Sequence, residues 1–141
     1  MNIIGHHKER DFLEQLISKK EVSQSTLFVG PESIGKRLVA LEWALKLINK
    51  KDFQPSLDQA TPLDIQILEP ERVTRRGVVR KKSIGVEEAR AALRFLRFSP
   101  QDGLYRVLII DDAHLLTAAA QNILLKFVEE PEPSVVIVFI T

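Results

Sequence analysis

The sequence predicts an α/β fold in which helices cover both faces of a mainly parallel sheet. Short apolar runs typical of strands alternate along the chain with helical patterns, which is the order of βαβ units. A glycine loop with the sequence GPESIGKR, at residues 30–37, stands between the first strand and the helix that follows it. The apolar run VLII at residues 107–110 leads directly into two aspartates, as in strands that are covered on both faces.

The first half of the chain predicts two helices and two strands. An amphipathic helix is expected over residues 8–19, followed by a short buried strand over residues 26–29. A helix over residues 38–48 is apolar nearly all round, so it should pack against a sheet and a second neighbour. Residues 50–62 contain two prolines and predict a loop, and residues 64–68 alternate like a strand.

The middle of the chain leaves two interpretations open. Residues 71–85 fit either two short β arms that turn at Arg76 and Gly77 or a disordered surface loop. A helix begins near Val86, and it should end before Ser99 because a residue that precedes proline avoids the helical region.

The last third of the chain predicts a strand, a helix and a further strand. After the apolar run at residues 107–110, a helix is expected over residues 117–130, and residues 135–140 form a second wholly apolar strand. The candidates for burial in that helix are Ala118, Ile123, Leu124, Phe127 and Val128.

Composition limits the class of protein. The chain has 141 residues, of which 45% are hydrophobic and 28% charged, as in one soluble globular domain or a part of a larger protein. A formal net charge of +1 gives no overall attraction to nucleic acid or membranes. The absence of cysteine excludes disulfides and thiolate metal sites. With no signal peptide and no apolar stretch of roughly 20 residues, we expect a cytoplasmic protein without a membrane partner.

The glycine loop has the spacing of a phosphate-binding P-loop. In the pattern G-x-x-x-x-G-K, the two glycines let the backbone curl so that successive N–H groups converge on an anion, and the following helix adds its positive end. The lysine reaches the β and γ phosphates of a nucleotide. The expected nucleotide-binding residues of the loop are Gly30, Pro31, Ser33, Ile34, Gly35, Lys36 and Arg37.

Two positions depart from the pattern of a hydrolytic enzyme. The residue after the lysine is normally Ser or Thr, whose hydroxyl binds Mg²⁺, whereas Arg37 offers only N–H donors and a fixed positive charge. Asp111 can hold Mg²⁺ at the end of its strand, but Asp112 stands where hydrolytic relatives usually carry the longer Glu. Paired aspartates also cap helices, so Asp111 becomes a vestigial metal ligand only in combination with the glycine loop. Mg²⁺ binding therefore stays open.

A basic segment lies between the second strand and the third helix. Residues 72–82 contain six Arg or Lys residues and no aromatic residue for base stacking. The segment could contact phosphates of DNA or an acidic protein, and a merely solvated charged loop is the ordinary alternative. The three histidines, His6, His7 and His114, lack metal-ligand spacing, so no zinc site is expected.

With these motifs in place, the sequence resembles the AAA+ proteins of bacterial clamp loaders, and among them the delta prime branch of DNA polymerase III subunits. The most specific stretch is QNILLKFVEEP at residues 121–131, because an N-x-L-L-K-x-x-E-E-P run after a D-[DE]-A motif resembles little else. The other matching stretches are IGH at 4–6, LFVGPESIGKR at 27–37, KSIGVEEAR at 82–90, VLIIDDAH at 107–114 and the sensor 1 strand at 137–141.

The resemblance implies a three-layer, RecA-like AAA+ domain with a role in DNA replication. Clamp loaders are hetero-pentamers in which delta prime, delta and gamma/tau subunits open a sliding clamp and set it on primed DNA. Delta prime is typically a stator without ATP hydrolysis of its own, and the Lys36–Arg37 ending of the loop is common in that branch. ATP or ADP would then bind weakly or not at all, with Ile4 and Gly5, within residues 2–6, lining the adenine pocket.

The resemblance leads to two expectations, one about a zinc module and one about the parts of the family that follow Thr141. Many members carry four cysteines that hold zinc between the P-loop helix and the second strand, and residues 50–62 contain none. The family continues past Thr141 with a fifth strand, an arginine finger, a lid domain and a collar, so residues 1–141 are expected to be its N-terminal part. In the usual strand order 5-1-4-3-2, the strand at 26–29 would then be an exposed edge.

Two alternative functions also remain. An active ATP-hydrolysing subunit of the gamma/tau type predicts Ser or Thr at position 37 and Glu at position 112, whereas this chain has Arg37 and Asp112. A small P-loop phosphotransferase would need a basic clamp on the transferred group, for which residues 72–82 are the candidate. The run at 122–131 argues against that second alternative.

Overall fold

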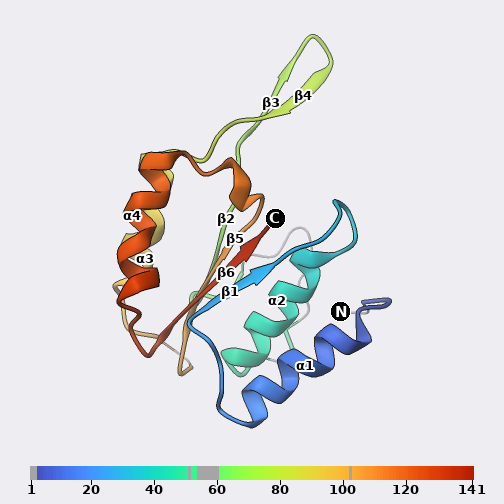
Figure 1. Cartoon of the computed structure of the whole chain (residues 1–141), viewed down its shortest axis with the longest axis vertical. Helices are drawn as coiled ribbons and strands as arrows, with labels where there is room; N and C mark the ends of the chain where they lie inside the picture. The colour runs from blue at the N-terminus through green and yellow to red at the C-terminus, as the bar shows by residue number, and fades with distance from the viewer. Residues whose placement is uncertain (1–2, 51, 54–60, 102) are drawn as a thin grey trace.

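The structure, a computed structural model, describes residues 3–50, 52–53, 61–101 and 103–141. A parallel sheet lies between two pairs of helices (Figure 1). Its strands, in the order β1-β6-β5-β2, are β1 (Ser25–Phe28), β6 (Val135–Ile140), β5 (Arg106–Ile110) and β2 (Ile65–Leu68). The helices are α1 (His7–Ser18) and α2 (Lys36–Leu47) on one face, and α3 (Val86–Leu96) and α4 (Ala118–Glu129) on the other. The three-layer α/β class predicted from the sequence is confirmed.

Strands β5 and β6 supply side chains to the hydrophobic cores on both faces of the sheet. Successive side chains of a strand point to opposite faces, so an apolar run without alternation can fill two cores at once. Val107 and Ile109 pack toward α2, whereas Leu108 and Ile110 pack toward α3 and α4. All four side chains are fully buried, which explains why the sequence of β5 contains no polar residue after Arg106.

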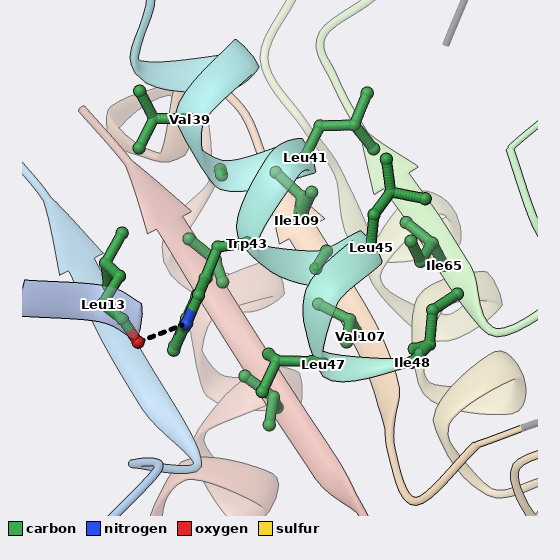
Figure 2. Packing of buried hydrophobic residues seen from close by; sticks show 14 of the residues in the cluster. Leu13, Val39, Leu41, Trp43, Leu45, Leu47, Ile48, Ile65, Val107 and Ile109 are labelled. Atoms are coloured by element: carbon green, nitrogen blue, oxygen red, sulfur yellow. Dashed lines mark hydrogen bonds between the residues drawn. The ribbon is translucent and has the colours of Figure 1, made fainter. Parts of the chain in front are cut away.

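Helix α2 is enclosed between the sheet and α1. Seven of its residues are buried, as its apolar sequence predicts. Trp43 lies at the centre of this packing, and its Nε1–H donates to the Leu13 carbonyl of α1 at 3.2 Å (Figure 2). Its ring also lies 6.4 Å from that of Phe28 in β1. One side chain therefore connects α1, α2 and the strand that leads into the glycine loop.

A buried ion pair fixes the opposite edge of the sheet. The Arg106 Nη2 lies 3.7 Å from the Asp64 Oδ1, and both side chains are almost inaccessible to solvent. Asp64 also accepts from the Gln101 N–H at 2.9 Å, and Arg106 donates to the carbonyls of Ser99 at 3.1 Å and Phe95 at 3.2 Å. These bonds hold the connection between α3 and β5 against the start of β2.

The strand predicted as buried over residues 26–29 is an edge strand instead. β1 pairs with β6 alone, and neither α3 nor α4 covers its second face. Leu27 is consequently 60% exposed and Val29 72% exposed, so the prediction of burial is wrong at these positions. The position of β1 at the edge matches the expectation from the family strand order.

Helix α4 buries a narrower stripe than its sequence predicts. Ala120 and Leu124 are buried and Ile123 and Phe127 are partly buried, but Ala118 and Val128 are exposed. The reason is that α4 packs on α3 and the sheet along one line, so residues displaced from that line face solvent.

The basic segment forms two β arms, and the alternative of a disordered surface loop is wrong. Strand β3 (Arg72–Arg75) pairs in antiparallel register with β4 (Val78–Lys81) through a turn at Arg76 and Gly77. Part of the loop predicted at residues 50–62 lies outside the described residues. No helix within the described ranges is long and apolar enough to span a membrane.

Replacing Trp43 with Ala should lower the free energy of unfolding by about 3–5 kcal/mol, because a large buried ring is lost and a cavity remains. Replacing it with Phe should cost less, since the ring volume largely stays while the bond to the Leu13 carbonyl is lost. Urea unfolding measures both changes. Leu38→Ala in the same helix is the control, because Leu38 is 48% exposed. Equal losses for Trp43→Ala and Leu38→Ala would contradict this account.

Candidate functional site

Parallel pairing brings the candidate residues to one edge of the sheet. The Thr141 N–H, just after β6, donates to the Phe28 carbonyl at 2.9 Å, and the Gly30 N–H donates to the Thr141 carbonyl at 3.3 Å. On the other side of β6 lies β5, which pairs in turn with β2. The N–H of Asp111, the residue after β5, donates to the carbonyl of Leu68, the last residue of β2, at 2.8 Å. The glycine loop and both aspartates therefore line one cleft of about 330 Å³, the size of a small-molecule site.

The glycine loop presents backbone donors at the start of α2. Ser33 and Gly35 adopt left-handed φ values of 61° and 93°, which turn the chain tightly ahead of the helix. No side chain caps α2, and the N–H groups of Gly35 and Lys36 have no hydrogen-bond partner in the described part of the chain. Free donors at the positive end of a helix suit an anion such as a phosphate.

Lys36 closes the loop on itself. Its Nζ donates to the Gly30 carbonyl at 2.6 Å and also to the Pro31 carbonyl. A bound phosphate would have to draw the ammonium group away from these carbonyls. Lys36 therefore stabilises the shape of the loop as well as offering a charge for a ligand.

Arg37 lies beside the residue predicted as a metal ligand. Its Nη1 forms an ion pair with the Glu69 carboxylate and lies 3.4 Å from the Asp111 Oδ2. A guanidinium at this distance neutralises the Asp111 carboxylate and repels a divalent cation, and position 37 supplies no hydroxyl ligand. The loop therefore fits phosphates, but the residues around Asp111 do not fit Mg²⁺.

Asp112 is held by the basic arm. The Lys81 Nζ lies 2.7 Å from the Asp112 Oδ2, and this hydrogen bond raises the pKa of Lys81 although partial burial opposes the rise. Asp112 has a left-handed φ of 50°, and its N–H donates to the Asp111 Oδ1 at 3.0 Å. Its carboxylate is thus engaged by a lysine rather than free to orient a water molecule.

The segment before α1 contacts the loop through His6. The His6 Nε2–H donates to the Ile34 carbonyl at 2.6 Å, and His6 lines an apolar pocket of about 430 Å³ beside the loop. Gly5 has a left-handed φ of 91°, and the Ile4 side chain is 94% exposed. Asn2 lies outside the described residues. Adenine binding by Ile4 and Gly5 stays a prediction.

Arg10 fixes this segment to α2. It binds the Glu42 carboxylate through two hydrogen bonds, from Nε at 2.8 Å and from Nη2 at 2.6 Å, and its Nη1 donates to the Ile3 carbonyl at 3.4 Å. The Arg10 hydrogen bond holds the pKa of Glu42 below its ordinary value, against the opposing effect of burial.

Sequence reasoning missed two residues that define the site. Glu69 follows β2 at the same sheet edge as Asp111, so the rule that places ligands beyond strand ends could have found it. Lys81 was visible only as one of six basic residues, because its contact with Asp112 depends on the direction of the arm.

The comparisons with known proteins identify the family of this chain. The family model described as "DNA polymerase III, delta subunit" matches residues 5–141. The chain belongs to this family. The fold class and family resemblance inferred from the sequence are thereby confirmed.

The individual relatives are named either as delta' subunits or as gamma/tau subunits of DNA polymerase III. The chain is 28% identical to DNA polymerase III subunit delta' of Pseudomonas aeruginosa, over 90% of this chain and 40% of the relative. It is 27% identical to subunit gamma/tau of Mycobacterium tuberculosis, over 99% of this chain and 24% of the relative. A crystal structure of a DNA polymerase III gamma subunit-related protein from Thermotoga maritima matches with a TM-score of 0.68 and 29% identity, covering 92% of this chain and 38% of that one. The chain thus spans less than half the length of these relatives.

Replacing Arg10 with Gln should lower the free energy of unfolding at neutral pH by about 1 kcal/mol, the scale of a charged hydrogen-bonded pair. Because the folded pKa of Glu42 lies below its ordinary value of 4.5, the pair contributes fully above pH 4.5 and loses its contribution as the pH falls through the folded value. The difference between variant and parent should therefore shrink below pH 4.5, as measured by urea unfolding across pH.

Arg90→Gln is the matched control, since Arg90 pairs with Glu87 on an exposed helix face and should change stability little at any pH. A difference between Arg10→Gln and parent that stays constant down to the lowest pH at which the protein folds would refute the role of Glu42.

Proposed function

We propose that this chain is the AAA+ part of a delta prime-type clamp-loader subunit, a stator that takes part in loading the sliding clamp on primed DNA without hydrolysing ATP. The observation that carries the proposal is the contact of Arg37 with Asp111 and Glu69. Its partners would be delta and gamma/tau subunits in a hetero-pentamer, in the bacterial cytoplasm.

The chemistry of phosphoryl transfer explains why this contact matters. Hydrolysis of a nucleoside triphosphate needs a metal ion that bridges the β and γ oxygens and a residue that positions the attacking water. In this chain a guanidinium lies against the residue that would hold the metal, and Lys81 binds Asp112, which stands at the water-positioning place. Both requirements are disabled by cations that belong to the chain itself.

The remaining nucleotide function would be structural. The free N–H groups of Gly35 and Lys36 support binding of the phosphates of ATP or ADP without a metal, while His6 holds the segment beside the loop. A nucleotide bound in this way would add to the contacts that already hold the N-terminal segment against the loop.

The active gamma/tau type is the second candidate, because several relatives of comparable identity carry that name. Arg37 and Asp112 favour the stator, since a motor subunit needs a hydroxyl at the first position and a longer carboxylate at the second. Membership of this family argues against the alternative that the chain is a small P-loop phosphotransferase.

Calorimetry with ATP should give the same affinity with and without Mg²⁺, because phosphates fit the loop and the metal does not. Lys36→Ala should weaken any binding by about tenfold or more, the loss of one charged contact of about 1.4 kcal/mol. The parent should show no ATP turnover above that of Lys36→Ala. A metal-dependent steady-state rate that disappears in Lys36→Ala would overturn the stator proposal in favour of the gamma/tau type.

Replacing Arg37 with Thr should restore a preference for Mg²⁺, because the variant releases Asp111 from its guanidinium and supplies a hydroxyl ligand. We expect Mg²⁺ to tighten ATP binding to this variant by about tenfold, against no change for the parent. Arg90→Thr, which removes an exposed arginine of α3, is the control. If Mg²⁺ leaves the affinity of Arg37→Thr unchanged, Arg37 is not what keeps the metal out.

A further inference from the structure

The β3–β4 arm, residues 72–82, extends away from the layers of the domain (Figure 1). Its register pairs Arg72 with Lys81 and Arg75 with Val78, and the turn between the strands consists of Arg76 and Gly77. Both turn residues have positive φ values, 50° and 76°, as in the two-residue turns that match the twist of a hairpin. The arm is therefore a regular β-ribbon with a tight tip.

The arm concentrates the positive charge of the chain. It contains Arg72, Arg75, Arg76, Arg80, Lys81 and Lys82 and no acidic residue, which gives it a formal charge of +6. The whole chain has a net charge of +1, so the other residues together carry −5. This separation places a strongly cationic ribbon on an otherwise acidic domain, and the overall net charge hides it.

The basic residues occupy both faces of the ribbon and its tip. Residues opposite each other in an antiparallel pair share a face, so Arg72 and Lys81 lie on one face. Arg80 pairs with Val73, two residues before Arg75, and these side chains lie on the other face. Arg76 is at the tip, and all of these basic side chains are at least partly exposed.

Four of the six basic residues have no counter-charge among the residues that the structure describes. Lys81 is paired with Asp112 at 2.7 Å, and Lys82 with Glu71 at 3.2 Å, both at the base of the arm. Within the described ranges the remaining residues, Arg72, Arg75, Arg76 and Arg80, form no ion pair. Their guanidinium groups are thus available to an external anion.

The direction of the arm is fixed at its base. The Lys82 N–H donates to the Glu71 carbonyl at 2.8 Å, and beyond it the Ile84 N–H donates to the Leu115 carbonyl at 2.8 Å. The Thr117 N–H donates back to the Ile84 carbonyl at 3.0 Å. Because the ribbon is already formed and anchored, a partner would not have to order it, which lowers the entropic cost of binding.

We propose that the β3–β4 arm binds duplex DNA by lying in the major groove between the two phosphate strands. A groove presents negative charge on both sides of an inserted element, and this matches a ribbon that is basic on both faces. The major groove is about 12 Å wide and admits a two-stranded ribbon. An acidic protein surface would engage one face only.

The composition of the arm favours the duplex over a single strand, because the arm has no aromatic side chain on which an unpaired base could stack. The arm would be the DNA contact of the proposed stator, so its biological role rests on the proposed function, whereas the charge argument does not involve the nucleotide site.

Fluorescence anisotropy of the full chain with a labelled duplex of about 20 base pairs, without nucleotide, tests the proposal. The parent should bind, with an affinity that falls steeply with salt. The double variant Arg75→Gln/Arg80→Gln should bind at least about tenfold more weakly and reduce the slope of log K against log salt by about 1.8, or about 0.9 for each lost phosphate contact. Arg75→Lys/Arg80→Lys keeps the charge and should stay near the parent.

Arg94→Gln/Arg97→Gln removes the same charge from exposed positions at the end of α3 and is the matched control. Equal weakening by the two Gln variants, or an unchanged affinity of Arg75→Gln/Arg80→Gln, would overturn the proposal. The proposal would also be overturned if the parent does not bind the duplex at low salt, or if it binds a single strand of the same length as tightly as the duplex. Because no nucleotide is present, none of these results depends on whether the chain hydrolyses ATP.

Discussion

The pairing of β6 with β1 on one side and β5 on the other is the interaction on which the rest of the structure depends. It places Thr141 between the glycine loop and Asp111, so that segments about 80 residues apart share one cleft. It also joins the two cores, because Val136 and Val138 face α2 while Val135 and Ile137 face α3 and α4.

Within that cleft, the balance of charge is set by residues from four elements. Lys36 and Arg37 come from α2, Glu69 and Asp111 follow β2 and β5, and Lys81 comes from the arm. Asp111 and Asp112 each meet a cation of the same chain, so the negative charge that would attract a divalent ion at these two carboxylates is compensated within the protein. These ion pairs leave the free backbone N–H groups of the glycine loop unchanged, and it is on such groups that an anion site of this kind depends.

The sequence is sufficient to predict where the helices and strands lie, but it does not predict most of the side-chain contacts between them. Runs such as residues 107–110 and 135–140 were located to within one residue, because a strand buried on both faces leaves an unbroken apolar signal. The same signal misled at Leu27, since an apolar composition does not reveal whether a helix covers the second face. Arg37 was recognised as anomalous, but its contact with Glu69 depends on which strands are neighbours, and the buried pair of Asp64 and Arg106 gave no pattern at all.

Because β5 and β6 contribute side chains to both hydrophobic cores, they determine how the molecule unfolds. Each core takes alternate residues of the same two strands, so neither core can melt while the other remains intact, and the layers should unfold in one cooperative transition. The β3–β4 arm supplies no residue to either core. Its local opening is therefore uncoupled from global unfolding, and amide exchange at its tip should report a much smaller opening free energy than exchange in β5.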